Sequence, residues 1–439
     1  MKKIIIIGAG QGGLRAGALL AEKGWDVTVY EKQAEDTLAP DWFDGISVRL
    51  FEDLEIPVPA DSFKGYAPTF IGPETQAGLF IRSPEESMDW SVNRRTLSAQ
   101  LVAFAKEKGV KFEFETKVKK LTFSNTAVTG VTVNGKDIAA DLVIDASGMN
   151  SPFRASLPLR AGIQAMPEED EVFNVYRGVY RQVPGFPLPA EKDRFRMYLK
   201  YQGKKSISWC GVEPSGELNV LVGMIGKMDL NSFNQLYAHL KMDNPIIDTV
   251  IDNRCAETPI PVRYPLTRFS YPGYTAIGDS AFMTIPVMGS GVENALRAGQ
   301  MLAESLLKAD SVDMSALWDY QVKYYRNIGA VCYLLDWVKR GLLATDNGEL
   351  KQFIESGAVT DEDIYALFSG NIREIPLEEL LHKPAALFAN RRFIGNLLSY
   401  IVKGLKAAAA AISIPPQYDT LKIAKWAAKA EKAMQAPRS

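Results

Sequence analysis

The first thirty-one residues combine two short apolar runs with one amphipathic stretch between them. Four consecutive isoleucines at 4–7 leave no polar position, which predicts a short strand buried on both faces. An Ala/Leu-rich stretch that continues to about Gly24 predicts a helix, and the apolar run after it predicts a strand that ends at Glu31. This strand–turn–helix–strand order is typical of a βαβ unit with parallel strands.

Similar patterns recur farther along the chain. They predict a helix at about 94–108, a strand with period-2 alternation over 111–123, and buried strands at 140–148 and 274–281. The Asn134–Gly135 pair between two apolar segments predicts a hairpin turn.

The remaining segments differ in how often Pro and Gly interrupt them. Residues 57–89 are rich in both, which favours loops and short strands, whereas 166–268 read mostly as strands of an antiparallel sheet. A long helix is predicted at 291–308, and the pattern beyond about 315 is helical to the end, including 391–412.

The glycines after the first strand have the spacing G-x-G-x-x-G. Gly8 permits the tight turn, Gly10 lets backbone approach a pyrophosphate, and Gly13 lets the helix pack on the strand. The phosphates then meet the unpaired N–H groups at the helix start, and Glu31 can accept hydrogen bonds from the adenosine ribose. The cofactor contacts predicted here are Gly8, Ala9, Gly10, Gly12, Gly13, Glu31 and Lys32.

A second segment, at 273–307, indicates which dinucleotide binds. Gly278 and Asp279 follow a buried strand, and a carboxylate there can hold a polyol chain by two hydrogen bonds. FAD contains such a chain, ribitol, and NAD does not. Pro286, Gly289 and Gly291 then shape a loop whose amides open the next helix, where positive potential suits a reduced flavin ring. We therefore predict FAD.

Composition narrows the remaining possibilities. The net charge of −2 is unlike that of a nucleic-acid-binding protein, and no nucleic-acid partner is expected. Three separated cysteines and two histidines give no metal-ligand pattern, so no metal is expected. The apolar N-terminal run is interrupted too early for a signal peptide, and no uncharged stretch is long enough to span a bilayer. We expect a cytoplasmic protein, with peripheral membrane contact left open for the basic amphipathic segment 391–412.

With ADLVIDASGMNSPFR at 140–154 as a third motif, the chain resembles the group-2 FAD-dependent oxidoreductases that include p-hydroxybenzoate hydroxylase. Within this superfamily it is most similar to the geranylgeranyl reductase-like family. The similarity lies in WSVNRRTLSAQLVAFAKEKGV at 90–110, in the GDSA segment continuing as NALRAGQMLAES, and in WDYQVKYYRNIG at 318–329.

The resemblance implies further site residues. Arg94 would contact FAD phosphate or ribityl oxygens, Gly45 and Ile46 would line the ring or ribityl chain, and Gly289 and Gly291 would lie against the isoalloxazine. In the middle motif, Ser147 and Gly148 replace the usual Asp–Gly, and Asp145 is the nearest carboxylate.

One family segment departs from its pattern. In SWCGVEP at 208–214, Gly211 replaces an expected Trp and Glu213 an expected Phe, which removes two apolar walls from an isoprenoid pocket.

The predicted fold class is α/β. A discontinuous Rossmann-like FAD-binding domain of the p-hydroxybenzoate hydroxylase type would contain 1–65, 90–165 and 270–330. An antiparallel sheet substrate domain would contain 66–89 and 166–269, and a helical region 331–439.

The preferred function is reduction of a C=C bond in an apolar, isoprenoid- or quinone-like substrate by hydride from flavin N5. The alternatives are a monooxygenase that uses a C4a-hydroperoxyflavin and a non-enzymatic flavin-binding carrier. Electrons would come from NAD(P)H as a transient visitor or from a donor protein. No catalytic residue is assigned, because a Tyr, a carboxylate or water could donate the proton.

Overall fold

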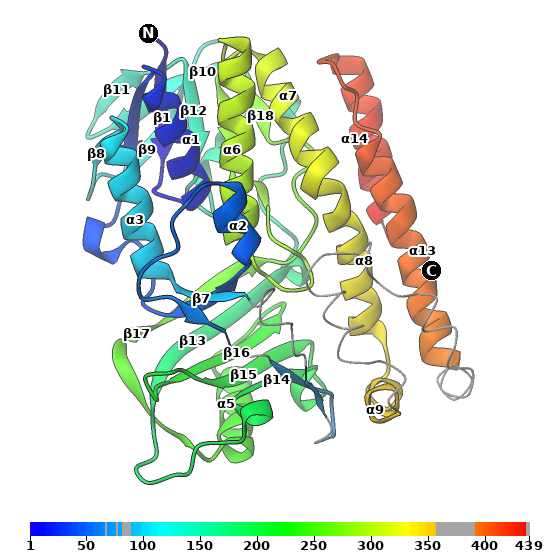
Figure 1. Cartoon of the computed structure of the whole chain (residues 1–439). Coiled ribbons are helices and arrows are strands. Elements are labelled where there is room, and N and C mark those ends of the chain that lie inside the picture. Colours follow the sequence, from blue (N-terminus) through cyan, green and yellow to red (C-terminus); the bar gives the residue numbers. More distant parts are fainter. Residues whose placement is uncertain (66–67, 76–77, 81–88, 357–390, 436–439) are drawn as a thin grey trace.

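A six-stranded sheet carries the N-terminal motif (Figure 1). The computed structural model describes residues 1–65, 68–75, 78–80, 89–356 and 391–435. The strands lie in the order β18 (Ser270–Tyr271), β19 (Tyr274–Ala276), β12 (Leu142–Asp145), β1 (Lys3–Ile7), β2 (Asp26–Tyr30) and β8 (Lys111–Glu113). All neighbours are parallel except β18 and β19. The isoleucines of β1 are at most 4% exposed, which confirms a strand covered on both faces.

Two helices of this domain meet at backbone contact. α1 (Gln11–Glu22) follows β1, α3 (Arg94–Glu107) matches the predicted helix at 94–108, and α6 (Val292–Ala309) matches that at 291–308. A Cβ added at Gly299 of α6 would lie 2.3 Å from the backbone oxygen of Gly12 in α1. Glycine at both positions therefore lets the two helices approach more closely than side chains would permit. This contact brings the first turn of α1 beside the first turn of α6, where Gly12 faces the carbonyl of Ala295.

A seven-stranded sheet, here called the cap sheet, lies below the first sheet in Figure 1. Its order is β17 (Ile247–Pro261), β13 (Val172–Gln182), β16 (Leu218–Ile225), β15 (Ser206–Val212), β14 (Phe195–Leu199), β5 (Thr69–Ile71) and β6 (Gly78–Phe80). All pairs are antiparallel except β14 and β5. The prediction of an antiparallel sheet between 166 and 268 is confirmed, and β5 and β6 join it from an earlier part of the chain.

Helix α5 (Leu230–Asp243) corrects the reading of 166–268 as mostly strands. Leu236 and Leu240, one helical turn apart, are fully buried, and the Asp229 side chain accepts a hydrogen bond from the Ser232 amide at the N-cap. Both are helix signals that the surrounding strand pattern obscured.

Two small sheets complete the β structure. One contains β3 (Phe43–Ile46), β7 (Trp90–Asn93) and β4 (Phe63–Lys64). Two short helices, α2 (Val48–Asp53) and α4 (Pro152–Ser156), follow β3 and β12 in the chain. The other contains β11 (Lys136–Ala139), β10 (Val128–Val133) and β9 (Val118–Phe123).

The second small sheet confirms one prediction and corrects another. The predicted hairpin turn is present, with φ values of 49° at Asn134 and 76° at Gly135. The single strand predicted over 111–123 is wrong, because Glu115 adopts a φ of 53° and interrupts it. β8 before that residue joins the large sheet, and β9 after it joins the small one.

A helical layer covers one side of the molecule (Figure 1). It contains α7 (Met314–Tyr324), a π-helical turn (Tyr325–Gly329), α8 (Ala330–Ala344), α9 (Asn347–Glu355), α13 (Arg391–Ile412) and α14 (Thr420–Met434). The prediction of helix beyond 315 is confirmed for the described residues, and 357–390 lie outside them. No helix in the described part of the chain is long and apolar enough to cross a membrane.

Four tyrosines form the centre of this layer. Tyr320, Tyr324, Tyr325 and Tyr333 are fully buried, and three of their rings pack around Phe269. Burial raises the pKa of each phenol well above its ordinary value.

Candidate functional site

A cavity of about 2010 Å³ lies between the six-stranded sheet and the cap sheet. The carboxyl ends of β1, β12 and β19, which run parallel, face it, as expected for ligand sites of open α/β sheets. Ten of the predicted cofactor residues line it: Gly10, Gly12, Gly45, Arg94, Gly148, Gly278, Asp279, Pro286, Gly289 and Gly291.

The glycine turn is held by close backbone contacts. Gly8 has a φ of +87°, and a Cβ added at Gly8 or Gly10 would lie 2.8 Å from the carbonyl oxygen of Ala146. A Cβ at Gly13 would meet the side chains of Ala146 and Ile6 at 2.8 and 2.9 Å. No side chain caps α1 at Gly10, so the positive end of this helix is open to the cavity at Gly10 and Gly12.

Glu31 braces this turn from outside the cavity. One carboxylate oxygen accepts a hydrogen bond from the Ala9 amide at 2.7 Å and the other accepts one from the Gln33 amide at 2.8 Å. Glu31 is buried, and Lys32 beside it is exposed. The cavity lining reaches neither of them, nor Gly8, Ala9 and Gly13.

Asp279 projects into the cavity beside the start of α6. A Cβ added at Gly291, the uncapped N-cap residue of α6, would lie 3.0 Å from the Asp279 carboxylate. Burial raises the pKa of Asp279, and the positive charge of Arg94 opposes that rise. No described residue donates a hydrogen bond to this carboxylate, so its acceptors are available to hydroxyl groups of a ligand.

Arg94 at the start of α3 has an anionic partner supplied by the protein. Its Nη1 lies 2.9 Å from Asp44 Oδ2, while its Nε is buried without a hydrogen-bond partner. The Asn93 side chain caps the helix by accepting from the Arg95 and Thr96 amides. Burial would raise the pKa of Asp44, but the guanidinium groups of Arg177 and Arg94 outweigh it and hold the pKa below its ordinary value.

The carboxylate of the middle motif is fully used by hydrogen bonds within the protein. Asp145 is fully buried and accepts hydrogen bonds from Ser147 Oγ at 2.6 Å, Tyr274 Oη at 2.7 Å and Ser280 Oγ at 3.2 Å. It also accepts one from Ser151, the N-cap of α4. Asp145 therefore does not replace the missing family carboxylate. Gly148 lines the cavity, but Ser147 does not.

Strand β3 positions the segment expected beside the ring. Gly45 lines the cavity, and nothing lies closer than 4.0 Å to a Cβ added there. The Ile46 side chain is 3% exposed and packs in the core, and Ile46 does not line the cavity.

The cap sheet supplies the apolar wall. The space expected for a tryptophan at 211 is filled from the neighbouring strand, because a Cβ added at Gly211 would lie 2.3 Å from the Phe195 ring. Gly223 and Phe173 repeat this arrangement, also at 2.3 Å. The apolar residues of this wall are Phe173, Val175, Phe195, Met197, Ile207, Trp209, Leu221, Ile225, Ile260 and Val262.

A polar cluster that the sequence reading missed crosses the same wall. Arg177 donates from Nε to Asn219 Oδ1 at 3.0 Å and pairs with Asp44. Asn219 Nδ2 donates to Glu213 Oε1 at 3.1 Å and to the Phe43 carbonyl at 3.4 Å. The signal available in the sequence was an arginine at 177 within a largely apolar segment, and the structure shows that this arginine is buried in β13.

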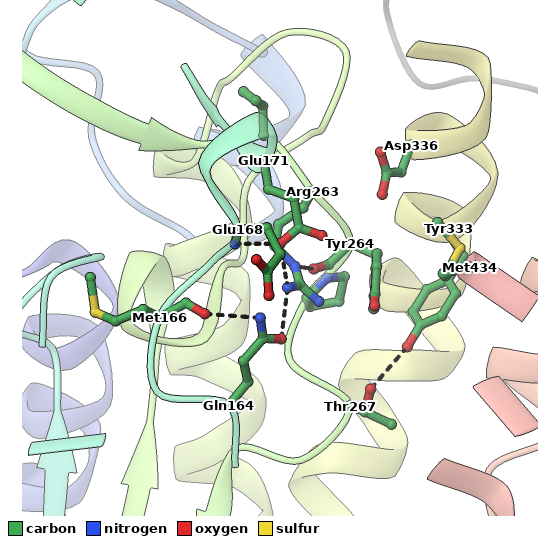
Figure 2. Close-up of polar contacts among 12 residues, drawn as sticks. Gln164, Met166, Glu168, Glu171, Arg263, Tyr264, Thr267, Tyr333, Asp336 and Met434 are labelled. Carbon is green, nitrogen blue, oxygen red and sulfur yellow. Dashed lines mark hydrogen bonds and ion pairs between the residues drawn. The ribbon is translucent and has the colours of Figure 1, made fainter. Parts of the chain in front are cut away.

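A second cavity of about 820 Å³ adjoins the first and shares Lys205, Ile225, Lys339 and Leu343 with it. Figure 2 shows Arg263 between Gln164 and Glu171, each 2.7 Å from its Nη1. Its guanidinium also lies 4.1 Å from the centre of the Tyr264 ring. Because Glu171 precedes β13 and Arg263 follows β17, this buried ion pair fastens the cap sheet to the loop that returns to the six-stranded sheet.

The site fits FAD on three observations. Two helices, α1 and α6, begin at the cavity without side-chain caps and suit anionic groups. Among the residues that the structure describes, none donates a hydrogen bond to the Asp279 carboxylate and none accepts one from the Arg94 Nε. The fold and the site thus define an FAD-dependent oxidoreductase with the p-hydroxybenzoate hydroxylase type of architecture.

Comparison with known proteins gives the family. Residues 1–246 match the FAD-binding domain family, and this chain belongs to it. The digeranylgeranylglycerophospholipid reductase of Sulfolobus acidocaldarius is 24% identical over 384 residues, covering 82% of each chain. One of the two such reductases of Methanopyrus kandleri is 25% identical, covering 80% of this chain and 94% of its own. The kynurenine 3-monooxygenase of Stenotrophomonas maltophilia is 23% identical, covering 71% and 73%.

Solved structures show the same fold. A geranylgeranyl bacteriochlorophyll reductase-like protein from Thermoplasma acidophilum superposes with a TM-score of 0.73 at 16% identity, covering 88% of this chain and 99% of its own. CtdE, solved with FAD and a substrate, gives 0.60 at 17% identity, covering 79% and 91%. The resemblance to the geranylgeranyl reductase-like group, the fold class and the enzymatic nature of the chain are confirmed.

Proposed function

We propose that this oxidoreductase reduces a carbon–carbon double bond in an extended apolar substrate of isoprenoid or quinone type. The cavity carries the proposal. It runs from Gly45 and Gly289 across the apolar wall of the cap sheet to Leu342 and Leu343 of α8. Its volume is about twice the upper end of the range for a single drug-sized ligand, roughly 1000 Å³, which leaves room for a long substrate beside a cofactor.

Each cofactor contact has a separate physical role in this proposal. The open start of α1 at Gly10 and Gly12 would hold the pyrophosphate, and Arg94 would lie near its phosphate or the ribityl oxygens. Asp279 would accept hydrogen bonds from the ribityl hydroxyls, and the start of α6 at Gly291 would favour negative charge on the reduced ring. When bound and reduced, FAD supplies a hydride for the alkene.

The curated relatives favour reduction over oxygenation, because the two digeranylgeranylglycerophospholipid reductases match 82% and 80% of this chain and the monooxygenase matches 71%. We propose that electrons come from NAD(P)H as a transient reductant or from a donor protein, since the sequence has a single dinucleotide fingerprint.

The test is an anaerobic half-reaction. Photoreduced holoenzyme is mixed with a digeranylgeranylglyceryl phospholipid in detergent micelles, and the flavin absorbance and the product mass are followed. We expect the flavin spectrum to return to the oxidised form with one double bond reduced per FAD. A flavin that stays reduced with prenyl lipids and with prenylated quinones would contradict the proposal.

A monooxygenase remains the second candidate, and the monooxygenase relative favours it. Aerobic turnover with NAD(P)H under labelled oxygen distinguishes the two. Incorporation of one labelled oxygen atom into product identifies the monooxygenase, whereas a product of increased hydrogen content identifies the reductase.

We also propose peripheral membrane contact through α13. Its Leu398, Val402, Leu405 and Ile412 form a stripe whose members are each about half exposed, and Lys406 beside them is exposed. Sedimentation with phosphatidylglycerol vesicles should recover the protein, and Leu405→Glu should reduce that recovery. Equal recovery of both proteins would contradict the contact.

A further inference from the structure

Reduction of an alkene needs a proton as well as a hydride, and the described lining of the main cavity restricts its source. That lining contains no tyrosine, histidine or cysteine. The candidates left in it are carboxyl and ammonium groups. Among the lysines, Lys339 donates to the Val262 carbonyl and pairs with Asp336, and Lys200 donates to the Thr345 carbonyl. Lys64 has its Nζ 4.6 Å from the centre of the Trp90 ring, and Lys205 is exposed.

Of the six other carboxyl groups in that lining, three have another role and three are exposed, namely Glu52, Asp89 and Glu191. Asp44 lies between two guanidinium groups that keep it ionised. Glu293 pairs with Arg297 in the first turns of α6. Asp279 stands beside Gly291 at the proposed ribityl position.

Glu213 differs from these groups in its surroundings. It follows β15 on the cap-sheet wall and receives one side-chain hydrogen bond, from Asn219 Nδ2. The charged groups that face it are engaged elsewhere: Arg177 with Asp44, and Arg254 with Glu217 and Asp41. No described cation lies within ion-pair distance of Glu213, and burial is the main cause that raises its pKa.

Asn219 also fixes where Glu213 stands relative to the proposed ring site. The same Nδ2 that bonds Glu213 lies 3.4 Å from the carbonyl oxygen of Phe43 in β3. Gly45, two residues along β3, lines the cavity where the ring is expected. One side-chain amide therefore spans the distance from the Glu213 carboxyl to the strand expected beside the ring.

We propose that Glu213 is the proton donor of the reduction, an assignment that rests on the proposed reductase function. One alkene carbon takes a hydride from reduced FAD, and its neighbour takes the proton from the Glu213 carboxyl. Two C–H bonds form, while the alkene π bond, the bond to the transferred hydride and the O–H bond of Glu213 break. The reduced FAD would thereby lose two electrons, and Glu213 would become a carboxylate. Those electrons are replaced by the nicotinamide or protein donor proposed above.

The place of Glu213 in the fold also provides a route for its reprotonation. It opens the turn between β15 and β16, where its amide donates to the Glu217 carbonyl at 2.8 Å and its carbonyl accepts from the Gly216 amide at 2.9 Å. Pro214 and Ser215 in that turn are exposed. The Glu213 side chain lines the cavity, and the residues next to it in the chain are exposed to solvent. Solvent can therefore return a proton to the ionised carboxylate through this turn.

The test compares Glu213→Gln with Glu191→Gln, the same change at an exposed carboxyl group of the same cavity lining. With the photoreduced holoenzyme and the geranylgeranyl lipid, we expect Glu213→Gln to slow alkene reduction by about 10²–10⁴-fold, the usual contribution of a positioned acid. Glu191→Gln should react at the wild-type rate. Wild-type rates should fall as the pH rises above the pKa of Glu213, whereas the residual rate of Glu213→Gln should not follow this limb.

A second measurement does not depend on turnover. The infrared difference between wild-type and Glu213→Gln protein should contain a protonated-carboxyl band that disappears at a pH above the ordinary glutamate range. A Glu213→Gln enzyme with the wild-type rate and pH profile would overturn the assignment, as would a raised KM with unchanged kcat. An inert wild-type enzyme would overturn the proposed function, and the assignment with it.

Discussion

The two walls of the cavity are built by different means. On the FAD side, backbone approaches backbone: Gly12 meets the Ala295 carbonyl, and Gly299 meets the Gly12 carbonyl. On the cap side, side chains from one strand cover glycines of the next, as Phe195 covers Gly211. The first kind of wall tolerates almost no change in residue type, whereas the second can keep its surface while the residues that form it are exchanged.

The largest expected difference between the walls concerns FAD affinity. Asp279→Asn should weaken FAD binding by about 10- to 100-fold, because hydrogen bonds to a charged group contribute roughly 1.5–3 kcal/mol. Glu213→Gln, the same chemical change on the cap wall, should leave FAD affinity unchanged. Titration of each apoprotein with FAD, followed by flavin fluorescence, measures both. Equal losses of FAD affinity in the two variants would contradict the proposed functional difference between the walls.

The next difference concerns the glycine contact between α1 and α6. Gly299→Ala should lower the free energy of unfolding by about 1–3 kcal/mol, because its Cβ has no space beside the Gly12 backbone. Gly395→Ala in α13 is the matched control, since nothing lies within 4 Å of a Cβ there, and it should stabilise the protein by about 0.4–1 kcal/mol. Denaturant unfolding gives both values. If both variants change the free energy of unfolding in the same direction, crowding at Gly299 does not determine the effect of the added methyl group.

The cap wall should respond to compensation where the FAD wall does not. Gly211→Trp alone should destabilise the protein, because the new side chain overlaps the Phe195 ring. Adding Phe195→Gly should recover a large part of that loss, with a coupling energy of about 0.5–3 kcal/mol for residues in contact. A double-mutant cycle of unfolding free energies measures the coupling, and strictly additive values would refute the exchange of ring positions across the strands.

The smallest expected effect is the acid sensitivity of Asp44, whose side chain is 22% exposed and partly screened by solvent. Because Arg177 and Arg94 hold its pKa below the ordinary value, its contribution is present at neutral pH and is lost as the pH falls through the folded-state pKa. The stability difference between wild type and Asp44→Asn should therefore shrink in acid, below about pH 4. Thermal unfolding across that range tests this, and a constant difference would contradict it.

This contrast also explains what the sequence could predict. The βαβ start, the hairpin at Asn134–Gly135 and the helix opened at Gly291 each depend on a conformation or an approach that glycine provides, and such positions have strong local signals. Ten of the residues chosen for the cofactor accordingly line one cavity.

The cap wall could not be predicted in the same way. Reading Gly211 as the loss of an aromatic wall ignored Phe195, which is sixteen positions earlier and adjacent only through strand pairing. The chain of contacts from Asp44 through Arg177 and Asn219 to Glu213 joins four separate elements, and no local pattern reports it. Helix α5 was missed for a different reason, because the segments before and after it in the sequence have strand patterns.

The four buried tyrosines of the helical layer have a consequence for alkaline solutions. A phenol held neutral in the folded state but free to ionise once unfolded draws the equilibrium toward the unfolded chain as hydroxide increases, beginning near pH 10. Phenolate absorbance should therefore appear in one abrupt step for these rings, together with the loss of helical circular dichroism. The unfolding of this protein by base could thus be followed by its own ultraviolet absorbance, without any added dye.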